Sequence, residues 1–101
     1  MLKIGIDLDD CITYCPDFFK AMTNSMNDLA EIHIITNREQ TPESEANTRN
    51  DLDELGIHYH HLVITPDKTD YIIKNGISIY LRILLVDQIA RLYLLSMLII
   101  S

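Results

Sequence analysis

The sequence is short of cysteine and of glycine-rich turns, and each shortage excludes a class of function. Two cysteines, Cys11 and Cys15, stand in a C-x₃-C spacing. This spacing matches neither a C-x-x-C redox motif nor half of a recognisable zinc site. Both are expected to be reduced thiols, which fits a cytoplasmic protein. No Gly-x-Gly-x-x-Gly turn follows the first apolar run, which excludes a dinucleotide-binding fold.

Positive charge is also scarce. The chain has 8 lysines and arginines against 15 aspartates and glutamates, a formal net charge of −7. This charge argues against a nucleic-acid backbone or an anionic membrane surface as the main partner. It leaves room for a small phosphorylated substrate, because local cations can override the global sign. The start MLKIGIDLDD reaches charged residues too early for a signal peptide, so none is expected.

The chain has 101 residues, of which 48% are hydrophobic, enough for the core of a single domain over 1–101. Apolar runs and helical periodicity alternate along it. They predict strands at 4–8, 31–36, 58–65 and 77–86, and helices at 16–29, 41–55 and 66–75. This order predicts an α/β, three-layer Rossmann-like fold with a mainly parallel sheet and right-handed crossovers.

The helix over 16–29 is expected to be amphipathic. Pro16 suits its first position. Three- and four-residue spacing predicts one buried stripe of Phe18, Phe19, Met22, Met26 and Leu29. In the next helix, Thr41 is expected to be the N-cap. Gly56 and Gly76 are expected to end the second and third helices in the left-handed conformation.

The segment 80–101 differs from the rest of the chain. Gln88–Ser101 carries one charge, Arg91, and has no glycine or proline to end it. It is too short to span a bilayer, and a longer reading would have to carry Arg82 and Asp87. We therefore expect no membrane span. A helix that packs on the core, or joins two copies in a homo-oligomer, is the expectation.

Three carboxylates follow the first predicted strand: Asp7, Asp9 and Asp10. Ligands of open α/β sheets bind beyond the carboxyl ends of the strands. Clustered acids repel one another unless a cation offsets their charge, and the next few residues supply no lysine or arginine. Mg²⁺ prefers oxygen ligands, so the cluster predicts a metal and phosphate site. The alternative is a solvated acidic turn.

Two further residues are expected at the same edge of the sheet. Thr36 ends the second strand, and Lys68 stands at the start of the helix after the third. Phosphoryl transfer through an aspartyl-phosphate needs a carboxylate nucleophile, a second carboxyl group for proton transfer, and cationic and hydroxyl groups for the phosphoryl oxygens.

His58 and His60 share a face of the third strand, but they lack a third ligand nearby, so a packing role is favoured over metal binding.

The motifs IGIDLDDC, HIITN and PDKTDYIIKNGI, within residues 3–80, resemble the haloacid dehalogenase-like (HAD) superfamily of phosphotransferases. The phrasing HIITNRE is similar to its deoxyribonucleotidase-like branch. The resemblance implies Asp7 as nucleophile and Mg²⁺ ligand, and Asp9 as general acid/base with its backbone carbonyl on the metal. It implies that Thr36 binds the phosphoryl group and that Lys68 stabilises its charge.

The chain departs from the family pattern at two places. Cys11 stands where the first motif usually has threonine or valine. The fourth motif, acids that complete the Mg²⁺ site, is replaced by Leu81 and Arg82. Asp87 is the only carboxylate downstream, and it is the remaining candidate metal ligand if the last strand extends that far.

The gaps between the motifs are too short to hold a cap domain, so an open site is expected. The function expected is a Mg²⁺-dependent phosphomonoester hydrolase acting on a small phosphorylated substrate such as a nucleotide. The alternative is a degenerate HAD-like domain that serves as a binding or assembly module. A receiver domain is disfavoured, because the strand ending at Thr65 offers no acceptor aspartate at its tip.

Overall fold

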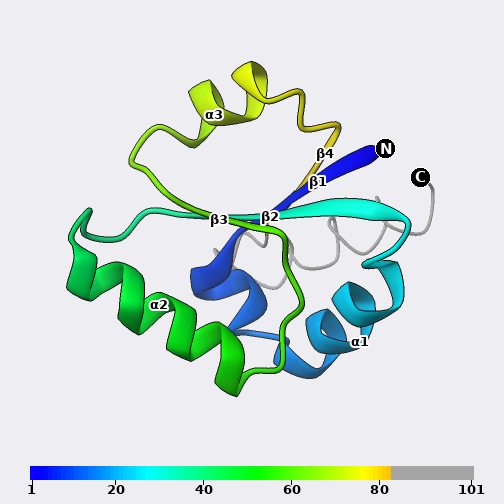
Figure 1. Ribbon diagram of the computed structural model, residues 1–101, viewed down its shortest axis with the longest axis horizontal. Coiled ribbons are helices and arrows are strands. Elements are labelled where there is room, and N and C mark those ends of the chain that lie inside the picture. The colour runs from blue at the N-terminus through cyan, green and yellow to red at the C-terminus, as the bar shows by residue number, and fades with distance from the viewer. Residues whose placement is uncertain (83–101) are drawn as a thin grey trace, which may run out of the picture.

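The protein folds around a parallel four-stranded sheet. The computed structural model describes residues 1–82, and 83–101 lie outside that description. The strand order is β3-β2-β1-β4, and all pairings are parallel (Figure 1). The strands are β1 (Leu2–Ile6), β2 (Ala30–Thr36), β3 (His61–Ile64) and β4 (Ile79–Leu81). The predicted α/β fold with a parallel sheet is confirmed.

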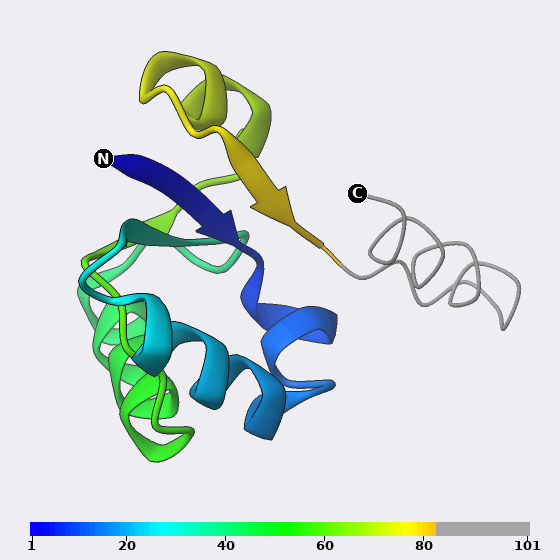
Figure 2. The same cartoon turned by 90° about the vertical axis from the view of Figure 1, so that its right-hand side faces the viewer.

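Helices cover both faces of the sheet. The helices α1 (Pro16–Met26) and α2 (Pro42–Glu54) lie on one face, and α3 (Lys68–Lys74) lies on the other (Figures 1 and 2). The three layers of helix, sheet and helix are those that alternating strands and helices predict. Residues 1–82 contain no cap or second domain.

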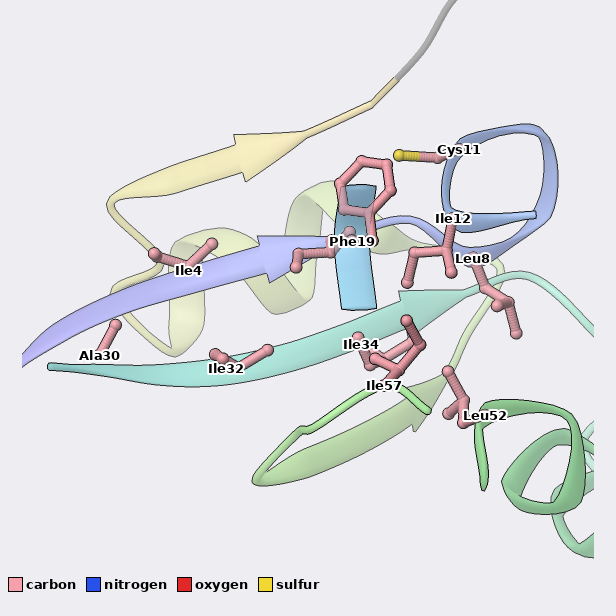
Figure 3. Packing of buried hydrophobic residues seen from close by; sticks show 11 residues of the cluster. Ile4, Leu8, Cys11, Ile12, Phe19, Ala30, Ile32, Ile34, Leu52 and Ile57 are labelled. Atoms are coloured by element: carbon pink, nitrogen blue, oxygen red, sulfur yellow. The ribbon is translucent and has the colours of Figure 1, made fainter. Parts of the chain in front are cut away.

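The main core lies between the sheet and the pair α1 and α2. Alternate side chains of a strand point to opposite faces, and the even-numbered isoleucines of β1 and β2 point into this core (Figure 3). Ile6 and Ile34 are fully buried there. The cluster consists of Ile4, Ile6, Leu8, Cys11, Ile12, Phe19, Ala30, Ile32, Ile34, Leu52 and Ile57.

The opposite face of the sheet is closely packed around Gly5. A Cβ atom at Gly5 would lie 2.9 Å from Ile35 Cδ1 and 3.1 Å from Tyr80 Cδ1. Tyr80 is the register partner of Gly5 on β4. The missing side chain therefore makes room for the tyrosine ring on the face that α3 covers.

The predicted stripe on the first helix is only partly correct. Phe19 is buried, but Phe18 is 59% exposed and packs edge-on against the Phe19 ring at 5.1 Å. Neighbouring helix positions lie about 100° apart, so only one of the two rings can face the sheet. The helix ends at Met26, which leaves Leu29 in the following turn and 72% exposed. Thr23 is buried in their place, with its hydroxyl donating to the Phe19 carbonyl at 2.7 Å.

Several element boundaries also differ from prediction. The first strand ends at Ile6, and Leu8–Ile12 form a helical turn, η1, where strand and coil were predicted. β3 begins at His61 rather than at 58. β4 covers Ile79–Leu81 of the predicted strand 77–86. The rest of that strand beyond Arg82, and the tail 88–101, fall outside the described residues.

The predicted N-cap of α2 and the predicted glycines at the ends of α2 and α3 are confirmed. Thr41 Oγ1 accepts a hydrogen bond from the Ser44 N–H at 3.1 Å, as an N-cap does. Gly56 and Gly76 have φ of +71° and +65°, in the left-handed region that favours glycine.

Cys11 is buried, Cys15 is half-buried, and no disulfide joins them. Within residues 1–82, no helix has the length and apolar character needed to cross a membrane.

The core position of Ile34 gives a direct test of this packing. Ile34→Ala should lower the free energy of unfolding by about 2–5 kcal/mol, because it removes a fully buried side chain and leaves a cavity. Ile73→Ala, the same change at a position 74% exposed, should alter it by no more than about 0.5 kcal/mol. Urea unfolding of both variants measures the difference. Equal effects would show that β2 does not form the core described.

Candidate active site

Asp7 lies at the carboxyl end of β1, where it connects three parts of the chain. Its N–H donates to the Leu81 carbonyl at 3.0 Å, which fixes it against the end of β4. Its Oδ1 accepts from the Leu8 N–H at 3.0 Å and from Lys68 Nζ at 2.8 Å. The residue is 9% exposed, so this ion pair is largely shielded from water. Asp7 is therefore fixed in place with a cation beside it.

The turn η1 separates the remaining acids. Asp9 is extended, whereas Asp10 has a positive φ of 59°, a conformation that aspartate tolerates better than most residues. The Asp10 N–H donates to Thr13 Oγ1 at 3.0 Å and stabilises the turn. The side chain of Asp10 is exposed, and that of Asp9 reaches the residues beyond β2. The three acids of the sequence cluster thus have different surroundings.

Arg38, just after β2, forms a bidentate ion pair with Asp9, which was not predicted from the sequence. Its Nε and Nη2 atoms donate to the two carboxylate oxygens of Asp9 at 3.0 and 2.8 Å. Its Nη1 atom donates to Asp51 Oδ2 at 2.9 Å and to Thr48 Oγ1 at 3.1 Å, both on α2. Arg38 therefore joins the acidic turn to α2.

These contacts change proton affinities in the site. The hydrogen bond from Arg38 lowers the pKa of Asp9 below its ordinary value of 3.8, against the opposing effect of burial. The Thr36 side chain and the Lys68 charge contribute in the same direction. Burial opposes the charge of Lys68, but the Asp7 carboxylate outweighs it and raises the pKa of that lysine. At neutral pH Asp9 is thus an ionised carboxylate and Lys68 a cation.

Two buried hydroxyl groups at this edge have no hydrogen-bond partner among the described residues: Thr36 Oγ1 and Tyr80 Oη. Thr36 ends β2, and its side chain lies near enough to Asp9 to help lower the pKa of that carboxyl group. Burial and the Asp7 charge raise the pKa of Tyr80, so its hydroxyl stays protonated. A buried polar atom without a partner is costly. These two hydroxyl groups are therefore suited to forming hydrogen bonds with a ligand.

The residues named from sequence thus divide into two groups. Asp7 and Lys68 are in contact, and Asp9 and Thr36 lie beside each other at the same sheet edge. Asp87 lies outside the described residues, so the structure gives no position for it. The few residues that follow the acids in the sequence include no lysine or arginine. In the fold, Arg38 and Lys68 supply that charge from distant parts of the chain.

The oxygen atoms present could hold Mg²⁺. Magnesium usually takes one or two protein carboxylates together with substrate phosphate, and it keeps several waters. The carboxylate of Asp7 and the backbone carbonyl of Asp9 are hard oxygen donors of this kind. The unpartnered Thr36 hydroxyl beside them is the feature expected of a phosphoryl site. Leu81 and Arg82, at the end of β4, add no acid.

The histidines singled out from sequence have local roles. The Nδ1 atom of His60 accepts a hydrogen bond from the Ile32 N–H at 2.9 Å, which links the segment before β3 to β2. The His58 and His60 rings pack edge to face at 5.4 Å. These contacts agree with the packing role predicted for the pair.

Comparison with known proteins gives no family assignment. No protein-family model, no curated protein and no solved structure matches the chain. The class of the chain is an α/β fold with a parallel four-stranded sheet.

Arg38→Met should raise the pKa of Asp9 toward its ordinary value of 3.8, because the substitution removes the two hydrogen bonds and the adjacent positive charge. Carboxyl carbon NMR titration of the two proteins measures the shift. Arg49→Met is the matched control, since Arg49 pairs with Glu45 on α2 and does not contact Asp9. An unchanged Asp9 titration in Arg38→Met would contradict the described pairing.

Thr36→Val should not lower stability, and a gain of up to about 1 kcal/mol is expected, because it removes a buried hydroxyl that has no partner. Thr23→Val is the matched control. The buried Thr23 hydroxyl donates to the Phe19 carbonyl and accepts from the His58 N–H, so its loss should cost about 1–3 kcal/mol. Urea unfolding compares the two. A loss in Thr36→Val as large as in the control would mean that Thr36 is bonded after all.

Proposed function

We propose that this chain is a Mg²⁺-dependent phosphomonoester hydrolase of the HAD type that acts through an aspartyl-phosphate intermediate. The observation that carries the proposal is the Asp7–Lys68 ion pair of 2.8 Å at the carboxyl edge of the sheet. A carboxylate nucleophile and a cation for the phosphoryl charge are thereby in contact. The unpartnered Thr36 hydroxyl supports it further, because a phosphoryl oxygen would give that group a hydrogen-bond partner.

Asp7 is the nucleophile in this scheme. One oxygen of its carboxylate attacks phosphorus, and the bond between phosphorus and the leaving oxygen breaks as the aspartyl-phosphate forms. The bond from the Leu8 N–H holds Oδ1, which leaves Oδ2 for the attack. Lys68 Nζ and Thr36 Oγ1 donate hydrogen bonds to the phosphoryl oxygens and offset their negative charge in the transition state.

Asp9 carries the proton. As the bond to the leaving oxygen breaks, that oxygen takes the proton of the Asp9 carboxyl group. The Asp9 carboxylate then accepts a proton from the water that attacks phosphorus. This step releases phosphate and regenerates the Asp7 carboxylate. In the resting site the hydrogen bonds from Arg38 keep Asp9 ionised, so Arg38 must withdraw and Asp9 must take up a proton from solvent water before it can act as an acid. Arg38 also pairs with Asp51, so it can keep this partner when it leaves Asp9.

Mg²⁺, when bound through the Asp7 carboxylate and the Asp9 backbone carbonyl, would supply positive charge against the phosphoryl oxygens. The proposed substrate is a small phosphomonoester, for example a nucleotide, as the similarity to the deoxyribonucleotidase-like branch suggests. Residues 1–82 contain no cap domain, so the loops that follow the strands would have to select the substrate.

A second candidate is a degenerate HAD-like domain that binds or assembles without catalysis. One observation favours it: β4 ends at Leu81 and Arg82 follows, where the family has its final metal-binding acids. An arginine at this position repels a divalent cation. In this case the chain would keep the fold and lose the metal.

Hydrolysis of an aryl phosphate by the purified full chain, with and without Mg²⁺, separates the two candidates. Turnover should depend on Mg²⁺ and fall by about 1,000-fold or more in Asp7→Asn, which removes the nucleophile. Asp10→Asn is the matched control, because Asp10 belongs to the same acidic turn but has an exposed side chain. It should keep activity within about threefold of the original.

Turnover that persists in Asp7→Asn would rule out the covalent route. If no activity is found and calorimetry detects no Mg²⁺ binding, the degenerate domain is the correct assignment. If Mg²⁺ does bind, calorimetry on Asp7→Asn checks the site, since a catalytic magnesium site should lose affinity in that variant.

A further inference from the structure

A second group of polar side chains lies on the face of the sheet that α3 covers. Glu31 and His33 are two residues apart on β2, so their side chains point to the same face. His61 on β3 is the register partner of His33. Strand pairing thus brings the three side chains together, although His33 and His61 stand far apart in the sequence.

The ligand atoms of the three residues converge on one point. His33 Nε2 lies 2.8 Å from Glu31 Oε1, and His61 Nε2 lies 3.1 Å from the same oxygen. All three ligand atoms lie within 4.8 Å of one another. The two imidazole rings stack with centroids 4.5 Å apart and planes inclined by 29°. Both rings therefore present the same nitrogen to the same carboxylate.

The imidazole ring of His33, the most buried of the three side chains, is held by a residue of α3. The Tyr71 hydroxyl on α3 lies 2.7 Å from His33 Nδ1. Burial raises the pKa of Tyr71, so its hydroxyl stays protonated and can either donate or accept this hydrogen bond. Metal-binding histidines usually bond their second ring nitrogen to such a partner, which fixes the ring and its tautomer. His33 has this arrangement already.

Solvent exposure increases from His33 to Glu31 to His61, so a metal ion could reach the group from solvent. The side chain of His33 is 4% exposed, that of Glu31 30%, and that of His61 52%. His33 Nε2 and Glu31 Oε1 are joined by a hydrogen bond at the buried end of the group.

We propose that Glu31, His33 and His61 form a zinc-binding site with a fourth position open to solvent. Two imidazole nitrogens and one carboxylate are a ligand set that Zn²⁺ accepts, with water as its fourth ligand. Mg²⁺ and Ca²⁺ prefer oxygen ligands throughout, so this site discriminates against the metal proposed for Asp7. With zinc on His33 Nε2, the Nδ1 atom of this ring would carry the proton and donate a hydrogen bond to the Tyr71 oxygen.

This site is separate from the one at Asp7. His33 precedes Thr36 by three residues on β2, which corresponds to about 10 Å along the strand. The zinc site faces the middle of the sheet under α3, whereas Asp7 and Thr36 lie at its carboxyl edge. The proposal does not rest on the phosphatase activity and can be tested without it.

Zn²⁺ titration of the metal-free full chain, followed by competition with a chromophoric chelator, tests the site. We expect one zinc ion per chain at this site. Glu31→Gln and His61→Ala should each weaken it by at least about 100-fold, since loss of an outer partner alone costs 10- to 100-fold. Tyr71→Phe should weaken it by about 10-fold. His58→Ala is the matched control, a histidine outside the cluster, and should bind as the original does.

Co²⁺ added in place of Zn²⁺ gives a readout of geometry. A strong visible absorption, typical of tetrahedral coordination, should appear in the original chain and disappear in His61→Ala. His61 is half-exposed, so this variant should remain folded, which circular dichroism verifies. Zinc that binds equally well to Glu31→Gln and His61→Ala would place the ion elsewhere and overturn the proposal. Failure of the original chain to bind zinc would also overturn it, leaving the three residues as a hydrogen-bonded group only.

Discussion

The parallel pairing of β1 with β2 is the constraint on which the rest of the molecule depends. It sets Ile4 beside Ile32 and Ile6 beside Ile34. Because strand side chains alternate, these isoleucines fill the core under α1 and α2, and the odd-numbered positions face α3. A register shift of one residue would turn Asp7 into the apolar core. The chemistry of the protein is therefore confined to one face of the sheet and its carboxyl edge.

The regular elements of the fold could be predicted because each follows from local sequence. Apolar runs mark the strands, and Thr41, Gly56 and Gly76 mark helix ends. The errors lie where tertiary packing decides. Nothing in the spacing distinguishes Phe18 from Phe19 as the ring that meets the sheet. The helical turn η1 depends on a positive φ at Asp10, which no propensity of aspartate requires.

The site divides in the same way. The proximity of Asp7 and Lys68 could be predicted because parallel strands end at one edge of the sheet. The roles of Arg38 and Tyr80 could not, since both depend on how side chains reach across neighbouring elements. The group around His33 was missed for a related reason. The sequence drew attention to His58 and His60, which are close along the chain, whereas His33 and His61 meet through strand register.

Helix α3 has a consequence for both sites, because it has no fully buried residue. It is attached to the sheet by Lys68 on Asp7, by Tyr71 on His33, and by the bond from Lys3 Nζ to the Asn75 carbonyl at 3.1 Å. Such bonds contribute only about 1 kcal/mol each, far less than a buried apolar face. The helix should therefore open locally at a lower free energy than the central strands, with faster exchange of its amide protons. One such opening would free Asp7 and His33 together, so a single short helix would govern access to both of the proposed sites.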